Sequence, residues 1–260
     1  MRIASGGHVA FAATMVGIGI LGLVKGDFTV VWAPVCKGLP ARHAMVYACA
    51  AMSAGCGLGL LWQRTSSTTA RLLLLWLLLW MLLFRVPSLF RTLSVDVYWS
   101  ACKTAVLIAA AWVLYATFAS DRYKRYLGFA SGDYGLRIAR ALYGLAIIPF
   151  GIAHFQYLKH TAAMVPGWLP GHMFWASVTG GAFIAAGIAV LTGVYARLAA
   201  ALSALQMGLF FLLVWVPAMA RGHMTSFDWA EAIITWVLTA AAWVVADSYR
   251  RLAWPALDFK

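Results

Sequence analysis

Apolar residues fill eight long runs of this chain, and short polar stretches separate each run from the next. A helix needs about 20 predominantly apolar residues to cross the hydrocarbon core of a bilayer, and each run comes close to that length. The pattern predicts eight membrane-spanning helices, at 8–24, 43–62, 68–86, 99–119, 136–155, 172–192, 195–217 and 229–246. Strand-like alternation of apolar and polar residues is missing from the sequence. The predicted fold class is therefore an all-α membrane protein.

The chain also matches itself when it is shifted by 130 residues, half of its length. The matches include residue types that an apolar chain seldom repeats by chance: Leu39-Pro40 with Leu169-Pro170, Val86-Pro87 with Val216-Pro217, Arg91 with Arg221, and Trp99 with Trp229. The self-match predicts a tandem duplication, with one four-helix repeat at 1–130, a second at 131–260, and a polar linker at 120–135. Because each half contains an even number of spans, the two repeats are expected to be parallel.

Composition and charge agree with a membrane protein. Hydrophobic residues make up 63% of the chain and charged residues 11%, and the mean hydropathy is +0.83. This is more apolar surface than one soluble core of this size hides, so the expected environment is the lipid bilayer. The net charge of +12 comes from basic residues that flank the spans and face anionic headgroups, which argues against nucleic acid as a partner. Twelve basic residues fall on the side of the termini and seven on the other, which predicts that both termini are cytoplasmic.

The connection between the fifth and sixth spans is a candidate ligand site. Its two prolines, Pro166 and Pro170, disfavour a continuous helix, so we expect an interfacial segment that lies over the helix ends. Aromatic walls with a few imidazole groups suit a flat amphipathic ligand, such as a quinone ring or a lipid headgroup. The predicted site residues are His154, Tyr157, His160, Trp168, His172 and Trp175.

This candidate site is predicted for the second half only. At the 130-residue offset, the counterparts of His154, His160 and His172 are Val24, Val30 and Arg42. The alternative is that these histidines are ordinary interfacial residues without a ligand. No closely spaced pair of the HxxxH type is present, so we predict no metal site.

Charged residues inside the spans are costly and need an explanation. Lys103 and Glu231 each lie about one turn inside a span near the outer side, so they either extend separately to the membrane surface or pair across the interface between the halves. Arg85 directly precedes Val86-Pro87, and we expect it to extend toward the surface as well. Asp27 is expected to form an exposed pair with Lys25.

Several stretches of the second half resemble the DoxX-like family of bacterial membrane proteins. They are Gly151–Phe155, the Pro166–Pro170 loop, Phe174–Gly181, Ile184–Ile188 and Ala196–Ala200, with a looser match in the first half at Gly26–Phe28, Leu39-Pro40 and Trp62–Pro87. The resemblance implies one four-helix unit in each half and a place in the bacterial cytoplasmic (inner) membrane. In some members it also implies association with membrane redox, as a subunit of thiosulfate:quinone oxidoreductase or a partner of periplasmic oxidative-stress proteins.

The sequence thus gives two hypotheses for function and assigns no catalytic residue. The first is an accessory subunit of a quinone-linked membrane redox system, with quinone as its ligand and a membrane or periplasmic redox protein as its partner. The second is a non-enzymatic membrane scaffold or assembly partner. Relatives often carry a Glu in the second span, where this chain has Ala182 and Phe183, and this favours the second hypothesis. A transporter is disfavoured because no broken helices face a polar midplane.

Overall fold

The computed structural model describes residues 5–35, 38–92, 94–119 and 130–252, apart from the side chain of Asp96. In this part of the chain, eight helical segments are long and apolar enough to cross a membrane, as the sequence predicts. In order they are α1 (Gly6–Lys25), α2 (Arg42–Leu61), α3 with η1 and α4 (Ser66–Arg91), α5 (Val95–Phe118), α7 (Gly132–Gln156), α9 (His172–Thr192), α10 with η2 and α11 (Ala196–Ala220), and α12 (Ser226–Asp247). A short helix, α8 (Leu158–Ala163), lies between α7 and α9.

The third span of each half contains one turn of π-helix at the same place. We call it the wide turn, because it is wider than a turn of α-helix. It is η1 (Met81–Arg85) before α4 (Val86–Arg91) in the first half, and η2 (Phe211–Trp215) before α11 (Val216–Ala220) in the second. A proline follows each wide turn, and because proline has no N–H and clashes with the preceding turn, it disrupts a regular α-helix. The wider turn carries each span past its proline, so both extend beyond the predicted ends at 86 and 217.

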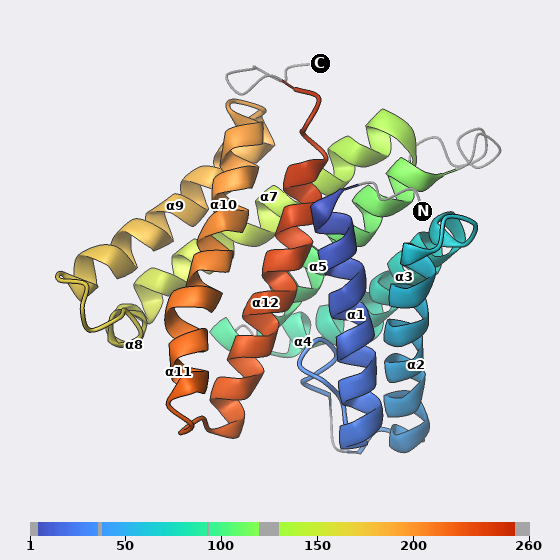
Figure 1. Cartoon of the computed structure of the whole chain (residues 1–260), viewed down its shortest axis with the longest axis horizontal. Coiled ribbons are helices and arrows are strands. Elements are labelled where there is room, and N and C mark those ends of the chain that lie inside the picture. The colour runs from blue at the N-terminus through green and yellow to red at the C-terminus, as the bar shows by residue number, and fades with distance from the viewer. Residues whose placement is uncertain (1–4, 36–37, 93, 120–129, 253–260) are drawn as a thin grey trace.

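The helices of the two halves pack in the same order. Within the first half α1 contacts α2, α2 contacts α3 and α3 contacts α5; within the second, α7 contacts α9, α9 contacts α10 and α10 contacts α12. Between the halves, α5 packs against α7 and α12 packs against α1, while α5 and α12 contact each other at the centre (Figure 1). The fourth helix of each half thus packs against the first helix of the other, as in two units related by a twofold axis.

The central helices α5 and α12 share a segment that suits close packing. Residues 106–113 read Val-Leu-Ile-Ala-Ala-Ala-Trp-Val and residues 237–244 read Val-Leu-Thr-Ala-Ala-Ala-Trp-Val, an offset of 131 residues. The three alanines of each segment are fully buried or nearly so. Small side chains let the helix backbones approach closely, which favours association where lipid gives no hydrophobic drive between helices.

Glycines bring the first two helices of each half into backbone contact. A Cβ atom on Gly57 of α2 would lie 2.7 Å from the carbonyl oxygen of Ala12 in α1. A Cβ atom on Gly187 of α9 would likewise lie 2.7 Å from the carbonyl oxygen of Gly144 in α7. No side chain fits at either crossing, so the lack of a side chain at these two positions sets the distance between the helices.

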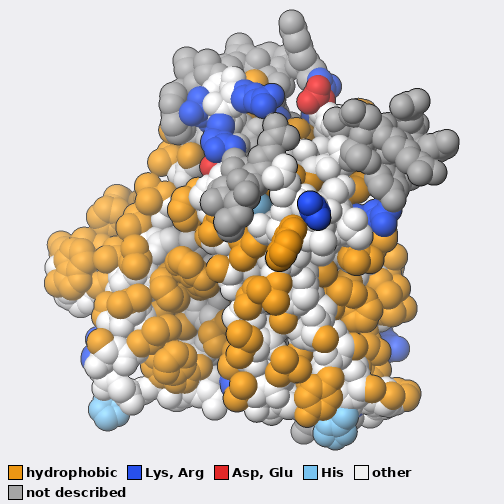
Figure 2. Space-filling model, turned by 45° about the vertical axis from the view of Figure 1, so that its right-hand side comes forward, with side chains coloured by type: hydrophobic (Ala, Val, Ile, Leu, Met, Phe, Trp, Pro, Cys, Tyr) orange, Lys and Arg blue, Asp and Glu red, His pale blue; other side chains and the backbone are white. Residues whose placement is uncertain are grey.

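The outer surface divides into an apolar belt and a basic end. Exposed apolar side chains cover most of the face in Figure 2, whereas Lys and Arg side chains gather at the end that carries both termini. We call this the termini end, and we call the opposite end, where α1 joins α2 and α7 joins α9, the loop end (Figure 1). The belt matches the bilayer environment expected from the composition.

The predicted linker at 120–135 is partly helical. Ser131 lies in extended backbone before α7, and the helix begins at Gly132, so the last four linker residues belong to the fifth span. Residues 120–129 of the linker lie outside the described residues.

The backbone contact at Gly57 gives a test of this packing. Gly57→Ala should lower the free energy of unfolding by about 1–3 kcal/mol, because the new methyl group overlaps the Ala12 carbonyl. Gly55→Ala is the matched control on the same helix, since its Cβ meets no atom within 4 Å, and it should stay within about 1 kcal/mol of wild type. Denaturant unfolding in detergent micelles measures both. Equal effects of the two substitutions would contradict the close crossing.

Candidate functional site

His154, the first of the six predicted site residues, lies inside the second bundle. Its side chain is 9% exposed, and its Nδ1 lies 2.7 Å from the carbonyl oxygen of Phe150 on the same helix. The imidazole stacks on Phe210, with 5.9 Å between ring centroids, and packs against Phe183 at 5.5 Å. His154 therefore joins α7 to α9 and α10 and is largely hidden from solvent.

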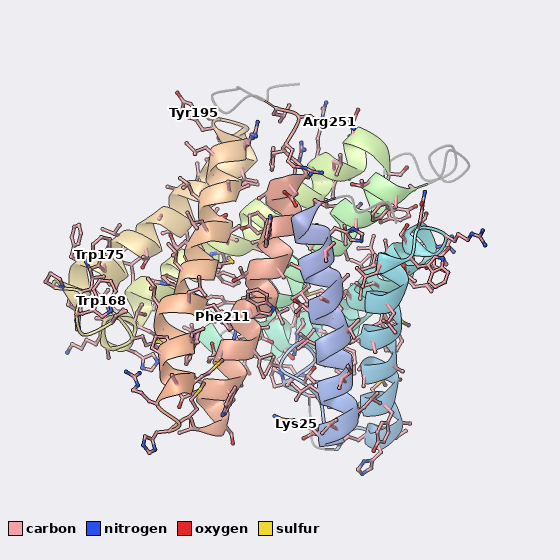
Figure 3. The ribbon with its side chains drawn as sticks, viewed as in Figure 1. Lys25, Trp168, Trp175, Tyr195, Phe211 and Arg251 are labelled. Carbon is pink, nitrogen blue, oxygen red and sulfur yellow. The ribbon has the colours of Figure 1, made fainter. Side chains whose placement is uncertain are left out.

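The other five predicted residues lie on the surface at the loop end. The exposed fraction is 72% for Trp168, 45% for Tyr157 and 37% for Trp175, and His160 is exposed. His172, the first residue of α9, is half-buried. Trp175 Nε1 donates a hydrogen bond to the carbonyl oxygen of Pro170, which fixes this indole against the loop. Figure 3 shows Trp168 and Trp175 together at the edge of the molecule.

Two cavities of about 510 Å³ lie in the described part of the chain, and none of the six predicted residues lines either of them. The structure thus brings five of the residues to one exposed region and places His154 in the interior. A shared ligand for all six stays a prediction.

The corresponding connection of the first half runs from α1 to α2, and its residues 27–35 fold into the first bundle. We call this segment the inserted loop. Trp32 is 1% exposed, its Nε1 donates to Ser53 Oγ at 3.2 Å, and its ring lies edge-on to Trp80. At the 130-residue offset, Ser53 and Trp80 correspond to Phe183 and Phe210, the two rings around His154. Trp32 from the loop therefore fills the place that His154 fills from a helix in the second half.

In the first half, a glycine occupies the position equivalent to His154. Gly19 crosses α2 at Ala50 and Ala54 just as Gly151 crosses α9 at Gly180 and Ile184, which aligns Gly22 with His154. A Cβ atom on Gly22 would lie 3.0 Å from the Ala50 Cβ of α2 and at ordinary contact distance, 3.5 Å, from the Thr29 side chain of the loop. A side chain as large as imidazole at this position would therefore meet both α2 and the loop.

Arg85 holds the inserted loop in place. The guanidinium is 3% exposed and donates to the backbone carbonyls of Trp32, Ala33 and Pro34 at 3.1, 2.7 and 2.9 Å, with a longer contact of 3.5 Å to Val31. Its Nε also donates to Thr104 Oγ1 of α5 at 3.3 Å. The expectation that Arg85 extends to the membrane surface is wrong, because the loop carbonyls give its charge hydrogen-bond partners inside the bundle.

The second half has no cation at this place. Trp215 occupies the position equivalent to Arg85, is buried, and donates from Nε1 to Thr235 Oγ1 at 3.1 Å. Both residues are the last of their wide turn, which directs them inward. The sequence signal for Arg85 was this substitution of a charged residue for a tryptophan next to a repeated proline.

Lys103 and Glu231 lie together across the contact between α5 and α12. Lys103 Nζ is 3.2 Å from Glu231 Oε1, and the two side chains are 18% and 28% exposed. Lys103 Nζ also lies 5.5 Å from the centre of the Trp99 ring. The pair links the two halves near the loop end.

Asp27 pairs with Arg42 and not with Lys25. Asp27 Oδ1 accepts from the backbone N–H of Phe28 at 2.7 Å and from Arg42 at 2.6 Å. The backbone hydrogen bond and the nearby guanidinium lower the pKa of the Asp27 carboxyl. Arg42 also lies 5.0 Å from the centre of the Phe28 ring, so this contact joins the start of α2 to the loop.

Comparison with known proteins leaves the family open. No protein-family model matches the chain, and neither a curated protein nor a solved structure matches it. Within the described residues, no group of three or more His, Cys, Asp or Glu side chains is placed to hold a metal ion. The chain is defined by its fold as a multi-pass α-helical membrane protein, and the DoxX-like resemblance stays a prediction.

Removal of the Arg85 guanidinium should release the loop. Arg85→Leu leaves the loop carbonyls without their donor, so we expect the free energy of unfolding to fall by about 3 kcal/mol. Amide hydrogen exchange in the peptide 27–35 should accelerate. Arg91→Leu, an exposed site on the same span, is the control and should leave exchange unchanged. Unchanged exchange in both variants would show that Arg85 does not hold the loop.

The contact between Lys103 and Glu231 can be measured by a double-mutant cycle. Lys103→Met should destabilise the protein by about 2 kcal/mol, because Glu231 is left partly buried without its cation. Adding Glu231→Gln should cost less than the sum of the two single substitutions, with a coupling energy of about 1 kcal/mol. Denaturant unfolding of the four proteins gives this energy, and strictly additive effects would argue against the pair.

Proposed function

We propose that this chain is a non-catalytic membrane subunit, a scaffold or assembly partner that contacts another protein through the α7–α9 connection. The observation that carries the proposal is that one of the two loops is buried and the other is exposed. The first loop is inserted into its bundle by Trp32 and Arg85, whereas the second presents aromatic side chains outward.

The exposed surface consists of residues around α8 and the start of α9. Its large side chains and exposed fractions are Trp168 at 72%, Phe174 at 62%, Met173 at 48%, Tyr157 at 45% and Trp175 at 37%. Trp, Tyr, Phe and Met are the residue types enriched at protein–protein interfaces, because rigid apolar side chains bury much area for little loss of conformational entropy. We name this set the loop-end aromatic surface.

The polar side chains inside the spans support the same proposal. Arg85 serves the first loop, Lys103 and Glu231 serve each other, and Tyr143 and Ser203 share a hydrogen bond of 2.8 Å between α7 and α10. These groups bind other parts of the same chain, so at the loop end the exposed side chains are the ones that can contact a second protein.

The partner proposed from the DoxX-like resemblance is a membrane or periplasmic redox protein of a quinone-linked system. On this proposal the chain lies in a bacterial inner membrane with both termini in the cytoplasm, as the excess of basic residues at the termini end indicates. The loop-end aromatic surface then lies at the periplasmic side, where such a partner and quinone are both accessible. The resemblance supports this version, and the exposed loop supports the more general one.

The test compares two pairs of exposed aromatic residues. We expect a stoichiometric partner to copurify with the wild-type protein from gently solubilised native membranes and to be lost at least tenfold from Trp168→Ala/Phe174→Ala, because the anchors of the contact are removed. Trp62→Ala/Phe90→Ala removes two aromatic residues of similar exposure elsewhere and should retain the partner. A partner retained equally by both variants, or found with neither variant nor wild type, would count against the scaffold.

A further inference from the structure

A region rich in arginine lies at the termini end, on the opposite side of the molecule from the loop-end aromatic surface. There a cavity of about 510 Å³ opens where the last turns of α5 and α12 meet the first turns of α7. Its charged lining residues are Asp133, Arg137, Arg140, Asp247, Arg250 and Arg251. Figure 3 places Arg251 at this end of the molecule, beyond the last turn of α12.

The charge of the lining favours an anion. Four arginine and two aspartate side chains line it, so basic residues outnumber acidic ones. One of the carboxylates is already used within the fold, since Asp247 Oδ2 accepts from the backbone N–H of Gly7 at 3.0 Å and so caps the start of α1. The first turn of α7 adds the partial positive charge of a helix N-terminus to the same cavity.

Arg140 is held rigidly in this lining. Its Nε donates to Ser248 Oγ at 3.0 Å, one terminal nitrogen donates to the Ser248 carbonyl oxygen at 2.5 Å, and its Cζ lies 3.9 Å from the centre of the buried Tyr249 ring. A guanidinium fixed in this way loses little freedom when it binds a phosphate group. The equivalent residue of the first half is His8, which is buried against the Leu60 carbonyl, so the shared helix packing does not require an arginine here.

The remaining lining points to an amphiphile. Val113, Leu114, Leu136 and Val244 give the cavity an apolar wall from α5, α7 and α12. The cavity thus has apolar lining residues on one side and basic lining residues on the other. A phospholipid has this order of groups, with an anionic phosphate above an apolar glycerol ester region, and basic cavities between membrane helices suit such headgroups.

We propose that this cavity binds the phosphate headgroup of an anionic phospholipid from the leaflet at the termini end. Arg137 and Arg251 are exposed side chains of the lining that approach the phosphate, and Arg140 is the fixed arginine behind them. The apolar wall receives the first carbons of the acyl chains. This inference does not depend on the proposed scaffold function.

The test measures lipid binding to the full-length protein in detergent. Thermal unfolding is followed with increasing phosphatidylglycerol or phosphatidylcholine, and native mass spectrometry counts the bound lipids. We expect phosphatidylglycerol to raise the Tm and to remain bound as a single tight adduct, and phosphatidylcholine to bind at least tenfold more weakly. In Arg137→Gln/Arg251→Gln the affinity for phosphatidylglycerol should fall at least tenfold.

Two controls make the outcome decisive. Arg64→Gln/Arg221→Gln removes the same charge from exposed sites away from the cavity and should bind phosphatidylglycerol as the wild type does. A similar loss in this control would overturn the proposal, because it would show general attraction to basic residues. Equal binding of the two lipids would also overturn it. Displacement of phosphatidylglycerol by millimolar inorganic phosphate would assign the cavity to a soluble phosphate and likewise overturn the lipid.

Discussion

Polar groups inside a bilayer must find their hydrogen-bond partners within the protein, because lipid offers none. This requirement explains the contacts that join the helices here. The Arg85 guanidinium takes its partners from a loop, Trp215 takes its partner from α12, and the Trp236 indole donates to Thr14 Oγ1 across the contact between the halves. Each of these three side chains therefore links its own helix to a second element.

Helix packing is shared by the halves, and the loop contacts are not. The crossings at Gly57 and Gly187, the wide turns before the prolines, and the alanine segments at the centre are the same in both. In the first half the loop packs beside Gly22, whereas in the second half the His154 ring fills the matching place. Because that place is filled by a helix side chain, the second connection lies at the surface.

The sequence by itself determined the fold class, the number of spans and their approximate limits. Long apolar runs and their polar breaks carry this information, since the bilayer sets the length of a helix that crosses it. The ends of the third and seventh spans were less accurate, because a proline was taken as a helix end and the structure continues past it through a wide turn. The signal for a shared wide turn was present only as the repeated Val-Pro pair.

Tertiary structure decided which side chains meet. The sequence grouped His154 with His172 because both flank one loop. In the structure His154 lies on the face of α7 that packs against Phe183 and Phe210, so it is in the interior. The inward direction of Arg85 depended on the wide turn and on loop carbonyls 51 and 52 residues earlier in the chain. The cavity at the termini end needed three helices from both halves, and spacing along the sequence does not encode such a meeting of separate elements.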